Sequence, residues 1–171
     1  MTQFYSHLLG SAANHLMGVD VSVLRAGPQL SARGAASLVL PVSHEEIDRA
    51  LASINDAKAP GVDGFNAFFF KKAWVWIKQD VYAAVLEFFK SGTILKQFNC
   101  TSVTLVPKVQ NPTLIKDYRP IACCTMVYKL IAKVLNARLQ AVIGEVVDQA
   151  QSGSIPQKHI ADNILLATER V

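Results

Sequence analysis

The sequence predicts an α+β fold that is mostly helical and carries one short β-hairpin. Apolar residues recur at helical spacing in several segments, most clearly over residues 125–143. Between Val103 and Val106 the pattern changes to a period of two, which is typical of a strand with one solvent-facing side. A chain of 171 residues, of which 51% are hydrophobic, is the size of one domain and can form a core.

Residues 1–40 show little pattern, because Gly27, Pro28 and Gly34 interrupt any long element. We interpret this segment as a linker or as the remnant of a preceding domain. The first clear element follows it. Ser43 and Glu46 have the spacing of a capping box, and apolar residues then recur every three or four positions. A helix over residues 44–55 is therefore predicted.

The next segment, NDAKAPGVDGF at residues 55–65, predicts a loop because Pro-Gly and Asp-Gly are turn dipeptides. It lacks the glycine and lysine spacing of a nucleotide-binding P-loop. From these residues alone, the simplest interpretation is a tight turn that carries an exposed Lys58.

Residues 67–78 and 80–91 predict two helices or one bent helix, between a capping Asn66 and a terminating Gly92. Six aromatic side chains of this region could stack on nucleic-acid bases. Their number and clustering favour packing in the core instead. These side chains are Phe68, Phe69, Trp74, Trp76, Phe88 and Phe89.

A β-hairpin is predicted over residues 101–124, with a polar turn after Pro107. Pro120 has no N–H to donate to a ladder, so the second strand is an edge strand or begins after this residue. Lys108 and Arg119 lie at the two bends of the hairpin. Two fixed positive charges within reach of one cluster of phosphates indicate a polyanion as the ligand.

The helix predicted over residues 125–143 places Leu130 in its apolar stripe, and Gly144 permits a break after it. A polar connector and a final helix follow. The chain stops within that helix at Val171 without a capping residue, which indicates a fragment.

The net charge is +4, and the charges are segregated along the chain. Asp117 is the only acidic residue between Phe88 and Gly144. The cations of this window are Lys90, Lys96, Lys108, Lys116, Arg119, Lys129, Lys133 and Arg138. Such a window indicates a positive surface that suits nucleic acid, while a solvated basic face without a partner is the alternative.

The three cysteines and four histidines lack metal-ligand spacing, so we assign no metal or catalytic site to them. No apolar run approaches the roughly 18 residues that span a bilayer, and the N-terminus lacks the features of a secretion signal. We therefore expect an intracellular protein, in the nucleus or the cytoplasm, without a membrane partner. The sequence does not indicate an oligomeric state.

Five segments, in this order, resemble the reverse transcriptases of LINE-type (non-LTR) retrotransposons, in particular those of plants. They cover the chain from about residue 40 to its end. The segments are KAPGVDGF, FFFKKAWVWIKQDV, NCTSVTLVPK, KDYRPIACCTMVYKLIAKVLNARL and QSGSIPQKHIADNILLATE. Two departures lie in the last segment, where Gln157-Lys158 replaces a Gly-Arg pair and Ser154 replaces an aromatic residue.

The resemblance implies that residues 41–171 are part of a reverse transcriptase domain: the fingers subdomain of a right-hand polymerase and the start of a truncated palm. It implies dNTP, an RNA template and DNA as partners. Lys108 and Arg119 would contact the triphosphate of the incoming nucleotide. Template-binding roles are implied for Lys58, Gly61, Asp63 and Gly64, near the template entrance, and for Gln151 and Lys158, along the template strand.

Polymerases of this family use two metal ions held by aspartates of the palm, including an adjacent pair. This sequence contains no Asp-Asp pair. We therefore expect no catalytic residue and no cofactor bound by this chain alone, although magnesium is expected for the complete enzyme. The predicted function is a fragment of a retrotransposon RNA-directed DNA polymerase that is inactive alone. The alternatives are a non-catalytic nucleic-acid-binding module and a decayed retroelement product without function.

Overall fold

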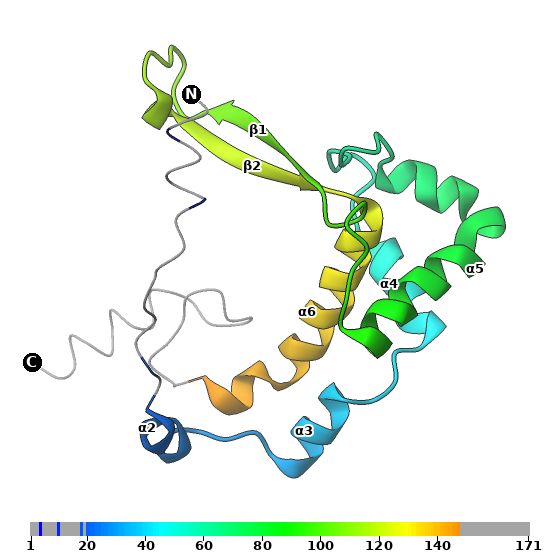
Figure 1. Cartoon of the computed structure of the whole chain (residues 1–171), viewed down its shortest axis with the longest axis vertical. Coiled ribbons are helices and arrows are strands. Elements are labelled where there is room, and N and C mark those ends of the chain that lie inside the picture. Colours follow the sequence, from blue (N-terminus) through cyan, green and yellow to red (C-terminus); the bar gives the residue numbers. More distant parts are fainter. Residues whose placement is uncertain (1–3, 5–9, 11–17, 19, 148–171) are drawn as a thin grey trace, which may run out of the picture. The chain divides into compact units, whose positions relative to one another are not determined.

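A computed structural model describes residues 4, 10, 18 and 20–147 (Figure 1). Its elements have an α+β arrangement, as predicted, with one sheet of two strands. In order they are α2 (Val21–Ala26), α3 (Ala32–Leu38), α4 (His44–Ser53), α5 (Ala67–Ser91), β1 (Thr101–Pro107), the 3-10 helix η1 (Ile115–Asp117), β2 (Tyr118–Cys124) and α6 (Met126–Val146). The helix predicted near the end of the chain lies outside the described residues.

The chain divides into two compact units. Within the described residues, one unit is helical and comprises residues 28–102 and 122–147, while the other includes residues 20–27 and 103–121 and holds the turn end of the hairpin. Among the described residues, no helix is long and apolar enough to cross a membrane.

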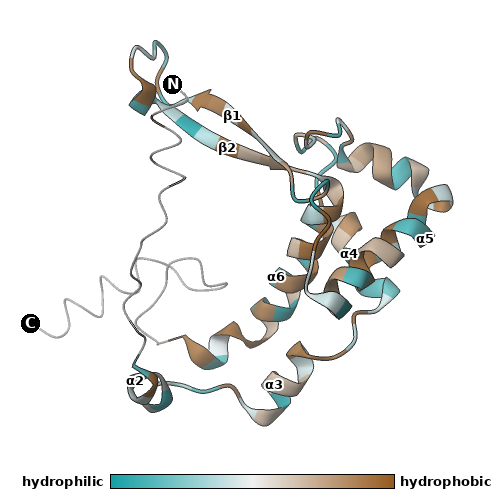
Figure 2. Cartoon of the chain, viewed as in Figure 1, coloured by the Kyte–Doolittle hydropathy of each residue, from teal (hydrophilic) through white to brown (hydrophobic). Residues whose placement is uncertain are grey.

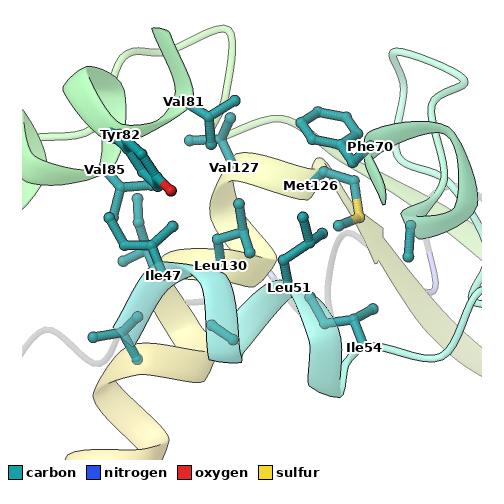
Figure 3. Packing of buried hydrophobic residues seen from close by; sticks show 14 residues of the cluster. Ile47, Leu51, Ile54, Phe70, Val81, Tyr82, Val85, Met126, Val127 and Leu130 are labelled. Atoms are coloured by element: carbon teal, nitrogen blue, oxygen red, sulfur yellow. The ribbon is translucent and has the colours of Figure 1, made fainter. Parts of the chain in front are cut away.

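The core of the helical unit lies where α4, α5 and α6 pack on one another (Figure 3). Ile47 of α4, Val85 of α5 and Leu130 of α6 have no exposed surface. The predicted burial of Leu130 is therefore confirmed. Burial of such aliphatic side chains stabilises a fold by roughly 1.5–3 kcal/mol each, so this cluster accounts for the packing of the three helices.

The capping box predicted at the start of α4 is confirmed. The Ser43 hydroxyl accepts a hydrogen bond from the Glu46 N–H at 3.3 Å, and the Glu46 carboxylate accepts one from the Ser43 N–H at 2.9 Å. Val42, just before the cap, packs against the core cluster that contains Ile47. This geometry fixes the direction in which the chain enters α4.

The segment predicted as two helices or one bent helix is a single helix, α5, of 25 residues. Both predicted caps are confirmed: the Asn66 side chain accepts from the Phe69 N–H at 3.0 Å, and Gly92 ends the helix with φ of 71°. Within α5, Trp74 and Tyr82 both donate to one oxygen of Asp48 on α4, at 3.0 and 2.7 Å.

Three features differ from the sequence prediction. Gly144 does not end α6, which continues to Val146. A short helix, α3, forms where no element was predicted, and its Gly34 lies against the Glu145 carboxylate of α6. The predicted one-sided strand is wrong for β1, since Val103 and Val106 are 49% and 43% exposed. Figure 2 shows hydrophobic residues of this exposed strand in brown.

Candidate nucleotide and nucleic-acid interface

The hairpin register is set by its closing hydrogen bond. The Lys108 N–H, just after β1, donates to the carbonyl of Asp117, just before β2, at 2.7 Å, so these two residues lie opposite each other at the turn end of the hairpin. Arg119 then lies opposite Val106, two residues further along each strand. Because residues two apart on a strand share a face, Lys108 and Arg119 are diagonal neighbours on the same face of the hairpin.

Diagonal positions on one face bring Cβ atoms within about 8 Å, which lies within the reach of two long side chains. Both Lys108 and Arg119 are exposed. The Lys108 ammonium donates to the Lys116 carbonyl at 2.7 Å, which uses one of its three N–H donors and leaves two for a ligand. The register places the two cations near each other along the hairpin, and the ligand role predicted for them stays a prediction.

Asp117, the acidic residue of the basic sequence window, builds the turn of the hairpin. The Asp117 carboxylate accepts hydrogen bonds from the backbone N–H groups of Thr113 and Leu114, at 3.1 and 2.9 Å. Its negative charge is directed into the turn, while Lys108, Lys116 and Arg119 remain exposed. The outer part of the hairpin therefore carries an excess of positive charge.

The predicted loop between α4 and α5 forms. Of the four residues for which a template-binding role was expected, Gly61, Asp63 and Gly64 determine the conformation of this loop. A Cβ at Gly61 would lie 2.6 Å from the Thr125 backbone nitrogen, so the loop can approach the start of α6 closely only with glycine there. Gly64 has φ of 75°, which favours glycine, and the Asp63 carboxylate accepts from the Phe65 N–H at 3.2 Å. Lys58 is exposed and remains a candidate for ligand contact.

In the helical unit, Lys129 and Arg138 of the basic window have structural partners. The Lys129 ammonium donates to the Ala59 carbonyl at 2.6 Å and holds the loop against α6. Arg138 pairs with Glu46; this hydrogen bond is the main cause that raises the pKa of Arg138 and lowers that of Glu46. The exposed cations of the helical unit in this window are Lys90, Lys96 and Lys133.

An open groove of about 600 Å³ lies between α4 and α6, beside the Arg138 pair. Arg49 of α4 and Lys133 of α6 line it together with apolar residues such as Val134. Within the part of the chain that the structure describes, no three carboxylate, imidazole or thiol groups gather where they could hold a metal ion.

The aromatic residues were predicted to pack in the core, and this is correct for only part of the set. Trp74, Phe88 and Phe89 pack against the core cluster. Phe68 and Phe69 are 50% and 42% exposed, and Trp76 is 78% exposed. The sequence signal for these exposed positions is weak, because 68, 69 and 76 lie on one side of a helix that is apolar on several sides.

Gln151 and Lys158, predicted to lie along a template, are outside the described residues.

No family model matches the chain. The chain is 32% identical over 139 residues to the "Transposon TX1 uncharacterized 149 kDa protein" of Xenopus laevis. The match covers 81% of this chain and 11% of that protein, so the chain spans about a tenth of the length of its relative. The chain is thereby related to a protein encoded by a transposon.

Proposed function

We propose that this chain is the fingers region of a reverse transcriptase encoded by a LINE-type retrotransposon, where it binds the incoming dNTP and the template. The observation that carries the proposal is the placement of Lys108 and Arg119 as diagonal neighbours on one hairpin face, since their N–H groups can converge on one triphosphate. The relationship to a transposon-encoded protein supports the same origin.

The two side chains offer complementary chemistry. The guanidinium of Arg119 presents a planar fork of N–H donors to two phosphate oxygens, whereas the ammonium of Lys108 acts as a mobile point charge. Together they would neutralise part of the charge on the triphosphate and orient it. Neither group supplies a nucleophile or a metal ligand, so the proposed role of this hairpin is binding and positioning.

Magnesium supplies charge neutralisation and orients the reacting oxygens in polymerases of this kind. Because the described residues bring no suitable set of ligands together, we expect the metal to be held by residues outside the described part. The activity of a complete polymerase is accordingly a property that we propose for a longer polypeptide.

The test is a titration of the chain with dATP, followed through the amide resonances of the hairpin. We expect the double variant Lys108→Ala/Arg119→Ala to bind at least about 10-fold more weakly, because each charge-assisted hydrogen bond contributes roughly 1.5–3 kcal/mol. Lys116→Ala is the control, since it removes one positive charge from the same turn and should change the affinity less than about 3-fold.

The double variant removes two positive charges and the control removes one. If the control lost about half as much binding free energy as the double variant, only net charge would matter, and a specific role for Lys108 and Arg119 would be contradicted. Absence of dATP binding combined with RNA binding would contradict the nucleotide role and favour the non-catalytic nucleic-acid-binding module. Circular dichroism of each variant checks that the helical unit remains folded.

A further inference from the structure

The first half of α5 exposes an unusual amount of aromatic surface. Phe68, Phe69 and Trp76 are between 42% and 78% exposed, and Val75 beside them is 76% exposed. Phe65, in the loop just before the helix, is exposed as well and stacks on Phe69 with ring centroids 4.5 Å apart. An exposed apolar cluster of this size marks an interaction surface.

These residues form one continuous face. At about 100° per residue, positions 68, 69, 72, 75 and 76 fall within roughly 120° of the helix circumference. From Phe68 to Trp76 the face extends roughly 12 Å along the axis, at about 1.5 Å per residue. We call Phe65, Phe68, Phe69, Lys72, Val75 and Trp76 the α5 aromatic face.

The charge of this region is positive. Residues 67–78 contain three lysines and no acidic residue. Lys71 is paired with Asp56 at 2.6 Å. Lys72 lies over the Phe68 ring, 5.6 Å from its centroid, and the exposed Lys58 lies in the loop that leads to the helix. Lys72 thus accompanies the rings, and Lys58 is a second exposed cation in the loop that precedes the helix.

We propose that the α5 aromatic face stacks the unpaired bases of a single-stranded nucleic acid, while Lys72 and Lys58 contact its phosphates. This inference rests on the proposed function, because it assigns the strand-binding role to a surface separate from Lys108 and Arg119. Aromatic rings beside cations are the arrangement by which proteins bind single strands, at roughly 1–3 kcal/mol per stacked base.

Charge favours this occupant over a protein partner. A partner protein that covered the face by apolar contact alone would need no cations, yet the acid-free stretch places Lys72 directly on a ring. A duplex is disfavoured because its bases are already stacked and paired within the helix. A face of roughly 12 Å matches three to four bases stacked at about 3.4 Å.

Trp76 provides a direct probe for the test. The chain has two tryptophans, and Trp74 is partly buried and hydrogen-bonded to Asp48, so quenching by a base should act mainly on Trp76. The full chain is titrated with a 12-nucleotide oligouridylate and, separately, with a 12-base-pair RNA duplex. We expect the single strand to quench the emission and to bind at least about 10-fold more tightly than the duplex.

Three variants locate the contact. Phe68→Ala should weaken oligouridylate binding about 10-fold, whereas Trp76→Phe should keep most of the affinity and lose most of the quenching. Leu95→Ala is the control, because it removes an exposed apolar side chain elsewhere in the same unit and should change the affinity less than about 2-fold. Thermal melts check that each variant is folded.

Equal binding of single strand and duplex, or an affinity unchanged in Phe68→Ala, would overturn the proposal. So would a concentration-dependent dimer that Phe68→Ala dissolves, because the face would then bind a second copy of the chain. The hairpin variant Lys108→Ala/Arg119→Ala should leave the quenching intact, and Phe68→Ala should leave dATP binding intact. These two variants thereby distinguish a failure of the proposed strand binding by the α5 aromatic face from a failure of the proposed dNTP binding by Lys108 and Arg119.

Discussion

Arg138 of α6 forms a bidentate ion pair with Glu46 of α4, through Nε at 2.8 Å and Nη2 at 2.9 Å. Its other N–H groups donate to the carbonyls of Leu38, Leu40 and Pro41, at 3.2, 2.6 and 3.1 Å. All five donors of the guanidinium are therefore used. One side chain joins α6 to the start of α4 and to the turn before it.

This role differs from that expected for a cation in a basic window. Arg138 is mostly buried, and its charge is neutralised by Glu46, whose own carboxylate also closes the capping box with Ser43. A charge directed at five protein acceptors is not offered to nucleic acid. The positive surface of the helical unit is accordingly smaller than the sequence window indicated.

We predict that Arg138→Lys lowers the free energy of unfolding by roughly 2–3 kcal/mol, because a lysine ammonium cannot reach both the carboxylate and the three carbonyls. Urea denaturation followed by circular dichroism measures the change. Arg49→Lys is the matched control, since Arg49 is exposed on α4 and should change the stability by less than about 0.5 kcal/mol. Equal effects of the two variants would contradict a structural role for Arg138.

A second prediction concerns the pH dependence of stability. The hydrogen bond from Arg138 lowers the pKa of Glu46 below its ordinary value of 4.5. A lowered folded-state pKa stabilises the protein above the unfolded-state value, and this contribution is lost as the pH falls through the folded-state value. We expect the wild type to lose stability below about pH 4.5 more steeply than Glu46→Gln does.

Denaturation midpoints measured between pH 7 and pH 3 provide the comparison. If both proteins lost stability in parallel over that range, the ionised Glu46 would not be the group that links folding to pH.

The elements that local chemistry determines were predicted well from the sequence. Ser43 and Glu46 have the spacing of a capping box, while Asn66 and Gly92 have the residue types of helix caps, and all these roles are confirmed. Gly144 was misjudged, because a glycine permits a helix to end but does not force it. The helix continues to Val146, and Glu145 at this end accepts a hydrogen bond from the Ser31 N–H at 2.7 Å, a contact 114 residues apart that the local sequence does not show.

The proximity of the two hairpin cations was predictable because it depends on the pairing register of the two strands. Lys108 and Arg119 could be placed near each other because a hairpin with a defined turn fixes which residues share a face. The exposure of Phe68 and Trp76 could not be predicted, since aromatic residues are usually buried and no local signal says which side of α5 meets the core. The pairing of Arg138 joins positions 92 residues apart, which a pattern of charges along the chain does not show.

A third prediction concerns the stability effects of replacing three glycines by alanine, which should differ because the glycines have different surroundings. Gly61→Ala should destabilise the protein by roughly 2–3 kcal/mol, because its Cβ would lie 2.6–2.7 Å from backbone atoms of Cys124 and Thr125, which cannot rotate away. Gly64→Ala meets no atom within 4 Å and should cost about 1 kcal/mol for its positive φ. Gly144→Ala, inside α6 with open space around it, should stabilise by about 0.5–1 kcal/mol.

Thermal and urea unfolding of the three variants gives their order. A milder effect for Gly61→Ala than for Gly64→Ala would mean that the loop can move away from the start of α6, and that the close approach is not required for folding.

The last prediction uses two leucines of the same helix. Leu130 has no exposed surface and contributes to the core shared by α4, α5 and α6, so Leu130→Ala should lower the free energy of unfolding by roughly 2–5 kcal/mol. Leu139→Ala removes the same atoms from a side chain that is 51% exposed and should cost less than about 1 kcal/mol. Both variants change a leucine of α6 to alanine, so they change the helix propensity equally. The difference between their free energies of unfolding therefore measures the contribution of side-chain burial. Similar unfolding free energies for the two variants would mean that α6 presents a different face to the core in solution.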